Sequence, residues 1–174
     1  MANQFTYQVL KDTTEHVIVK LTGRFDTEVQ EDNPNRISAN SFSGALNANG
    51  TTGLLSQGGS ALSYYGLTVH RIWYDTVNSA SSDVELYWNA NSAISLMFLS
   101  GNSEYDGAGN WVTIPNAAKN TSGCNGDIGI RTRGYGANTS YTIVMELRKE
   151  NEYYQRGQFN DPAAFNYGQY SINR

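Results

Sequence analysis

The sequence predicts one all-β domain, an antiparallel β-sandwich or jelly roll of about eight strands. Two observations lead to this fold class. Apolar residues alternate with polar ones along most of the chain, which is typical of strands with one buried face. Charged residues make up only 16% of the chain, so its polarity comes mainly from Asn, Ser, Thr, Gln and Gly, which suit turns and extended segments.

The strands can be placed in order from this alternation. Clear period-2 segments are Phe5–Val9, Val17–Leu21, Val84–Trp88 and Tyr141–Leu147. Two segments read as strands buried on both faces, namely Leu67–Tyr74 and Ile94–Leu99. Shorter candidates are Trp111–Ile114 and Ile128–Thr132.

Turns and packing follow from the same pattern. Residues 89–92 (Asn-Ala-Asn-Ser) are expected to close a hairpin, and residues 106–110 to form a second turn. A helix is expected only as one short turn at 160–164. The alternation predicts one shared core that includes Val84, Leu86, Trp88, Ile143 and Met145.

Two regions do not fit a compact sandwich. The stretch 37–64 has no charged residue and five glycines, and it is long for a loop. It either folds back on its own sandwich or packs on a neighbouring subunit. The segment 150–174 follows the last clear strand, so the sequence predicts a β-sandwich domain over 1–149 and an extended aromatic tail over 150–174.

Both regions contain large apolar side chains that suit an interface. The tail either docks on a partner, which we favour, or wraps its own domain. Aromatic rings on an extended polar chain are good interface anchors. The expected partner-binding residues are Tyr153, Tyr154, Phe159, Phe165, Tyr167 and Tyr170 of the tail, with Phe42, Leu54 and Leu55 of the loop.

The sequence gives no sign of catalytic chemistry. His16 and His70 lie in predicted strands among apolar residues, and Cys124 lies in a loop with no base adjacent in sequence. One Cys and two distant His lack transition-metal spacing. Glu85 and Glu146 lie on outward strand faces, where nothing pairs them for glycoside hydrolysis. We therefore expect no enzyme, no catalytic residues, no metal and no cofactor.

Charge and hydropathy narrow the list of partners. The net charge is −4 and no basic run is present, so nucleic acid is not expected as a partner. No apolar run approaches the ~20 residues of a membrane helix, and no signal peptide is recognised, so synthesis in a cytoplasm is expected. The alternative is a sugar-binding platform formed by the three tryptophans, Trp73, Trp88 and Trp111, although Trp88 falls at a predicted core position.

Several segments resemble small β-sandwich proteins from the structural-gene regions of tailed bacteriophages, especially T4-like phages of marine bacteria. The resemblance is carried by residues 17–23 (VIVKLTG), 69–74 (VHRIWY), 83–90 (DVELYWNA), 122–128 (SGCNGDI) and 141–149 (YTIVMELRK). The similarity is one of strands and turns and involves no catalytic signature.

This resemblance implies a non-enzymatic virion protein, with capsid decoration ahead of a neck or tail position. Its implied partners are other virion proteins, such as the major capsid protein, and further copies of itself. The competing function class is a carbohydrate- or receptor-binding module.

Overall fold

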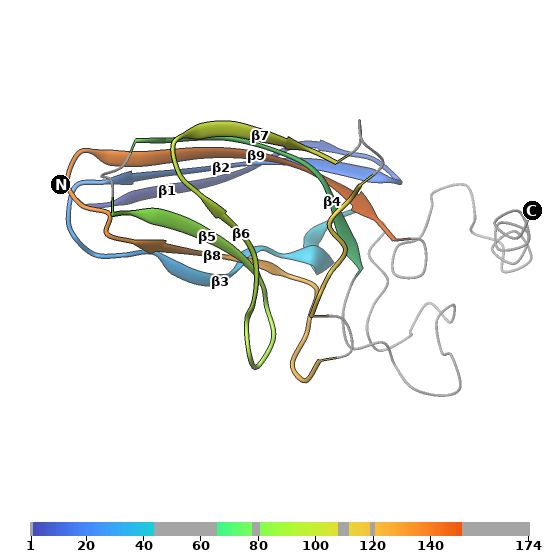
Figure 1. Cartoon of the computed structure of the whole chain (residues 1–174). Helices are drawn as coiled ribbons and strands as arrows, with labels where there is room; N and C mark the ends of the chain where they lie inside the picture. Colours follow the sequence, from blue (N-terminus) through green and yellow to red (C-terminus); the bar gives the residue numbers. More distant parts are fainter. Residues whose placement is uncertain (1, 44–65, 78–80, 108–111, 119–120, 151–174) are drawn as a thin grey trace, which may run out of the picture.

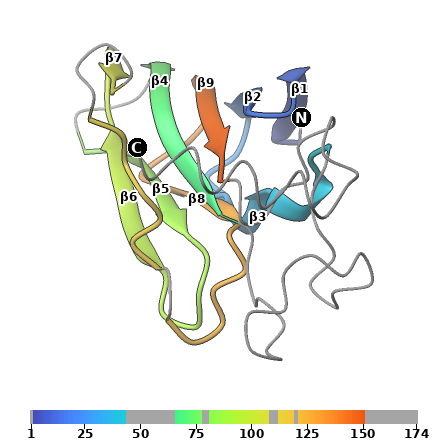
Figure 2. The ribbon, with the colours of Figure 1, turned by 90° about the vertical axis from the view of Figure 1, so that its right-hand side faces the viewer.

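The computed structural model describes residues 2–43, 66–77, 81–107, 112–118 and 121–150. Two antiparallel sheets face each other across one core (Figures 1 and 2). The first sheet has the order β1-β2-β9-β4-β7 and the second the order β3-β8-β5-β6. The predicted all-β sandwich is confirmed.

Nine strands and one short 3₁₀ turn are present in these residues. Their bounds are β1 Gln4–Asp12, β2 His16–Phe25, β3 Asp32–Ile37, η1 Ala39–Ser41, β4 Leu67–Val77, β5 Asp83–Trp88, β6 Ile94–Leu99, β7 Asn102–Asp106, β8 Ile128–Arg133 and β9 Thr139–Lys149.

The pairing of eight strands defines a jelly roll. Strand β2 pairs with β9, β3 with β8, β4 with β7 and β5 with β6, as if one long hairpin had been folded over itself. Strand β1 is added outside this pattern and extends the first sheet beyond β2. It therefore forms an edge.

The core lies between the sheets, as the alternation predicts. Val84, Leu86, Trp88, Ile143 and Met145 are all fully buried in one cluster. Strands β2 and β9 show the cleanest alternation, with every second side chain buried from Val17 to Phe25 and from Tyr141 to Lys149. The predicted hairpin turn joins β5 to β6.

Three sequence predictions are corrected. Strand β6 is an edge strand with mostly exposed or half-exposed side chains, so Ile94–Leu99 is not buried on both faces. On β4, Leu67 and Val69 are buried whereas His70, Arg71 and Trp73 are half-exposed, so only one face is covered. Of the predicted strand 111–114, the described residues 112–114 form a single bridge, between Ile114 and Val69.

Two strands were not predicted because they lack apolar alternation. Strand β3 contains Pro34, and β7 is mostly polar, with Tyr105 as its one large apolar side chain. Tertiary pairing with β8 and β4 holds these segments extended. The predicted helical turn at 160–164 lies outside the described residues.

Candidate functional site

Of the expected partner-binding residues, Phe42 is described and is wrongly predicted. Its ring is 3% exposed and belongs to the core cluster. The reason is that η1 turns the chain after β3 and directs Phe42 into the sandwich, where Nζ of Lys149 lies 6.0 Å from its ring centroid. The other expected contacts lie outside the described residues: Leu54, Leu55, Tyr153, Tyr154, Phe159, Phe165, Tyr167 and Tyr170.

The most apolar exposed strand among the described residues is β1. All nine of its residues are exposed, including Phe5 (37%), Tyr7 (38%) and Val9 (42%). These three stand opposite Gly23, Leu21 and Val19 of β2, so they point toward the same side as the core residues of that strand. Their alternation predicted a half-buried strand, but β1 lies at the margin of the larger sheet and its side chains stay accessible.

Strand β1 also offers backbone groups to a partner. Within the described chain it pairs with β2 alone, so its other edge presents peptide N–H and C=O groups. A bulge at Leu10, which is 49% exposed, interrupts the pairing between Val9 and Lys11. This surface, Phe5 to Leu10 of β1, is called the β1 edge below.

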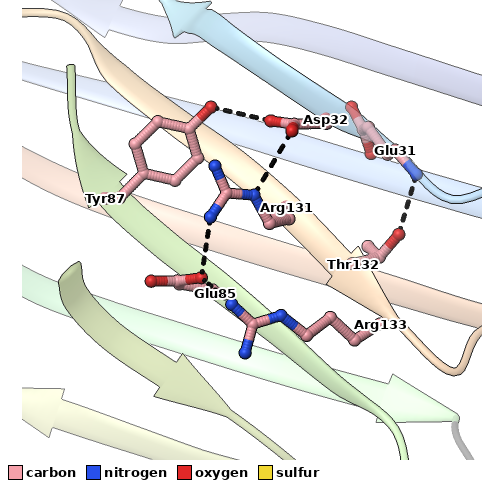
Figure 3. Close-up of polar contacts among 7 residues, drawn as sticks. All are labelled: Glu31, Asp32, Glu85, Tyr87, Arg131, Thr132 and Arg133. Carbon is pink, nitrogen blue, oxygen red and sulfur yellow. Dashed lines mark hydrogen bonds and ion pairs between the residues drawn. The ribbon is translucent and has the colours of Figure 1, made fainter. Parts of the chain in front are cut away.

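The outer face of the four-stranded sheet contains a polar network instead of an open site (Figure 3). Arg133 Nη2 lies 2.9 Å from Oε2 of Glu85, and Arg131 Nη1 lies 3.5 Å from the same oxygen. Arg131 Nε also lies 3.3 Å from Oδ2 of Asp32, and the Tyr87 hydroxyl donates to Oδ1 of Asp32 at 3.0 Å.

This network is internally satisfied. Two guanidinium groups face two carboxylates, and the guanidinium of Arg131 covers the Tyr87 ring at 4.9 Å from its centroid. Burial, followed by the hydrogen bond to Asp32 and its charge, raises the pKa of Tyr87 to about 12, so the hydroxyl remains a donor. The contacts join β3, β8 and β5, which indicates a structural role.

Glu85 and Glu146 lie on the outer faces of different sheets, as their positions predicted. They cannot face one cleft as the acid and base of a glycosidase must.

A second polar cluster lies on the outer face of the five-stranded sheet, and the sequence reasoning missed it. His16 on β2, Glu146 on β9 and His70 on β4 are contributed by three adjacent strands. One ligand-type atom from each lies within 4.8 Å of the others, and His16 Nδ1 is 3.3 Å from Oε1 of Glu146. The two imidazole rings meet edge to face with centroids 5.2 Å apart.

A β-bulge places His70 in this cluster. Val69 stands opposite Leu147 and Ile72 opposite Met145, and these four side chains face inward. Between these two pairs, β4 has two residues where β9 has one. The extra residue lets both His70 and Arg71 lie outside the core. No sequence spacing could reveal this, because the residues come from positions 16, 70 and 146 and meet only through strand order.

The electrostatics of this cluster are mixed. Burial lowers the pKa of His70, the charge of His16 lowers it further, and Glu146 opposes the change. Arg71 Nε lies 2.8 Å from Oδ1 of Asp106 and 3.8 Å from Oε2 of Glu146. Arg71 therefore pairs mainly with Asp106, and Oε1 of Glu146 faces His16.

Cys124 lies in the core cluster and is 4% exposed. Its sulfur accepts a hydrogen bond from Nδ2 of Asn116 at 3.7 Å. Both histidines lie on the outer face of the first sheet, so neither is placed to activate this thiol.

One of the three tryptophans considered for a sugar-binding platform is buried in the core. Trp88 is fully buried and Trp111 lies outside the described residues. Trp73 is half-exposed on β4, with the guanidinium carbon of Arg71 at 6.0 Å from its ring centroid.

Comparison with known proteins identifies no relative by sequence. No protein family and no curated protein matches this chain. Among solved structures, the chain is similar to a mutant of a carbohydrate binding module of family 29, with 8% identity and a TM-score of 0.33. The match covers 83% of this chain and 92% of that chain. Among the described residues, no helix has the length and apolar character needed to cross a membrane.

Proposed function

We propose that this chain is a non-enzymatic structural subunit of a virion, most specifically a capsid decoration protein that holds its neighbours through the β1 edge. The observation that carries the proposal is the nine-residue edge strand, with Phe5, Tyr7 and Val9 exposed along one side. An accessible strand edge with apolar side chains is a template for adding a strand from another chain.

Two further features support a structural role. The jelly roll occurs in viral capsid domains, although it also occurs in lectins, so this support is one of fold analogy. The resemblance of the strand and turn segments to phage virion proteins points to the same class. A neck or tail position is the alternative within that class.

The proposed occupant of the β1 edge is the 150–174 segment of a neighbouring copy. In each copy this segment starts beside β1, because Lys149, which ends β9, donates a hydrogen bond to Asp12, which ends β1. The 24 residues after Glu150 span up to about 80 Å when extended, which is more than twice the length of a nine-residue strand. The segment also supplies six aromatic rings to pack against Phe5, Tyr7 and Val9.

The experiment compares oligomeric state and particle incorporation for three forms of the chain. Val9→Lys places a charge on the β1 edge and should abolish both self-association and incorporation. Val77→Lys is the matched control, because Val77 is 56% exposed at the end of β4, away from β1. Removal of residues 151–174 should give a folded monomer that binds a synthetic peptide of that segment.

The outcomes separate the parts of this proposal. If Val9→Lys and the shortened chain both assemble as the intact chain does, the β1 edge is not the interface. If the intact chain is monomeric and loses stability when residues 151–174 are removed, the segment packs on its own domain. A mass-spectrometric inventory of purified particles then decides between decoration, with hundreds of copies, and a neck or tail position, with six or twelve.

The carbohydrate-binding alternative depends on rings that remain accessible. Trp73 is the one tryptophan that the structure describes as half-exposed. The test is to screen the intact chain and the Trp73→Ala variant on a glycan array. A sugar that is bound by the intact chain but not by the variant would support this alternative. Binding that survives in Val9→Lys would also separate the sugar site from the β1 edge.

A further inference from the structure

We propose that His16, His70 and Glu146 form a binding site for a divalent transition-metal ion, with Zn²⁺ as the best-fitting ion, on the outer face of the five-stranded sheet. Two imidazole nitrogens and one carboxylate oxygen are a donor set that Zn²⁺ accepts, with a fourth position left for water or another ligand. This inference is independent of the proposed virion role and of the β1 edge.

The distances are close to those that a bound ion requires. Zn–N and Zn–O bonds of about 2.1 Å in a tetrahedral site place neighbouring ligand atoms about 3.4 Å apart. His16 Nδ1 and Glu146 Oε1 are already 3.3 Å apart, and the three ligand atoms lie within 4.8 Å of one another. Closing the remaining gap takes a shift of at most about 1.4 Å, which rotation of an imidazole can supply.

One ring nitrogen of each histidine is buried without a hydrogen bond among the described residues. These two atoms are Nδ1 of His16 and Nε2 of His70. The His16–Glu146 approach is short, yet it does not have hydrogen-bond geometry. Two buried imidazole nitrogens without hydrogen-bond partners, in side chains that gather around one carboxylate, are unfavourable unless something binds them.

The surroundings position the donors. All three ligands come from the three middle strands of the sheet, in the order β2-β9-β4, with His70 at the bulge of β4, so hydrogen-bonded strands hold their backbones on both sides. Nε of Arg71 lies 3.8 Å from Oε2 of Glu146, which leaves Oε1 directed at His16. Arg71 is itself held by Asp106 at 2.8 Å, so its charge is largely compensated by a second carboxylate.

The test measures metal binding by the untagged full-length chain, since a polyhistidine tag would bind the same ions. Isothermal titration with Zn²⁺ should show one saturable site, and Co²⁺ should give a visible absorption band typical of low coordination number. His16→Ala, His70→Ala and Glu146→Gln should each weaken Zn²⁺ binding by at least about tenfold.

Two controls separate this site from the rest of the chain. Lys20→Ala changes an outer-face residue of β2, and Cys124→Ser removes the buried thiol, so both should bind Zn²⁺ as the unsubstituted chain does. The thermal midpoint should rise on addition of Zn²⁺ to the unsubstituted chain and to both controls, but not to Glu146→Gln, which keeps the side-chain shape.

The proposal is overturned if the intact chain binds neither Zn²⁺ nor Co²⁺ saturably with a Kd below about 1 mM. It is equally overturned if binding persists unchanged when His16, His70 and Glu146 are replaced one at a time in folded variants. The three residues would then be a polar contact between strands.

Discussion

Lys149, the last residue of β9, donates a hydrogen bond from Nζ to Oδ1 of Asp12, the last residue of β1, 137 positions earlier in the chain. The Lys149 side chain is fully buried, and Nζ also donates to the carbonyl oxygens of Thr13 and Ser43, each at 2.7 Å. Three donors therefore meet three acceptors, which is the condition for tolerating a buried ammonium group.

Replacing Lys149 should be costly. Lys149→Ala removes the donor to Oδ1 of Asp12 and to two carbonyl oxygens, so we expect the free energy of unfolding to fall by about 3 kcal/mol. The adjacent Arg148 is exposed, and Arg148→Ala should change it by less than about 0.5 kcal/mol. Urea denaturation measures both, and equal effects would contradict the buried anchor.

The contacts of the next residue, Glu150, indicate where the chain can be shortened. The amide of Glu150 donates to the carbonyl of Gly66 at 3.1 Å, and the Thr68 hydroxyl lies 3.2 Å from Oε1 of Glu150. A chain ending at Glu150 should therefore unfold at nearly the same temperature as the intact chain, measured by circular dichroism. A large drop would mean that residues 151–174 belong to the folded domain.

Trp88 should be the most sensitive single core position. Trp88→Ala is expected to cost about 3–5 kcal/mol because the ring is fully buried between the sheets. Its indole N–H is buried without a hydrogen-bond partner in the described residues, so Trp88→Phe should cost less than half as much. A loss below about 1 kcal/mol for the alanine variant would indicate an exposed ring.

Gly129 is required by the ring that lies over it. A Cβ at this position would lie 2.3 Å from a Tyr87 ring atom, and Asp32 and Arg131 hold that ring in place (Figure 3). Gly129→Ala should therefore destabilise the fold by about 1–3 kcal/mol. Gly136→Ala is the matched control, since its Cβ would meet nothing closer than 3.7 Å and the residue has no positive φ.

Asp127 should make the free energy of unfolding decrease as pH rises. Burial raises its pKa from 3.8 to about 6, although hydrogen bonds from the Ala39 amide and Asn125 side chain favour the ionised form. Between about pH 4 and pH 6 the folded state then binds more protons than the unfolded state, so the free energy of unfolding decreases as pH rises.

The matched measurement uses Asp127→Asn, which cannot titrate. Urea midpoints at about pH 4, 5, 6 and 7 should decline more steeply for the unsubstituted chain than for the variant. Only the difference is informative, because burial also raises the pKa of Glu31 whereas it lowers that of His70. Parallel profiles would contradict a titration of Asp127 in this range.

The period-2 pattern by itself determined the fold class, most strand positions and the shared core around Trp88. This succeeds because alternation reports directly which side chains a sheet must bury. It fails in β3 and β7, where pairing with neighbouring strands alone holds the backbone extended. It also fails in β1, an edge strand, since burial of its side chains depends on whether the second sheet covers them.

Only the tertiary structure decided which side chains meet. Phe42 was expected at an interface, yet the turn at η1 buries it beside Lys149. His16, His70 and Glu146 carry no spacing signal, but the strand order β2-β9-β4 and one bulge bring them together. Alternation along a strand is a local property, whereas contacts across a jelly roll depend on the order in which distant strands pair.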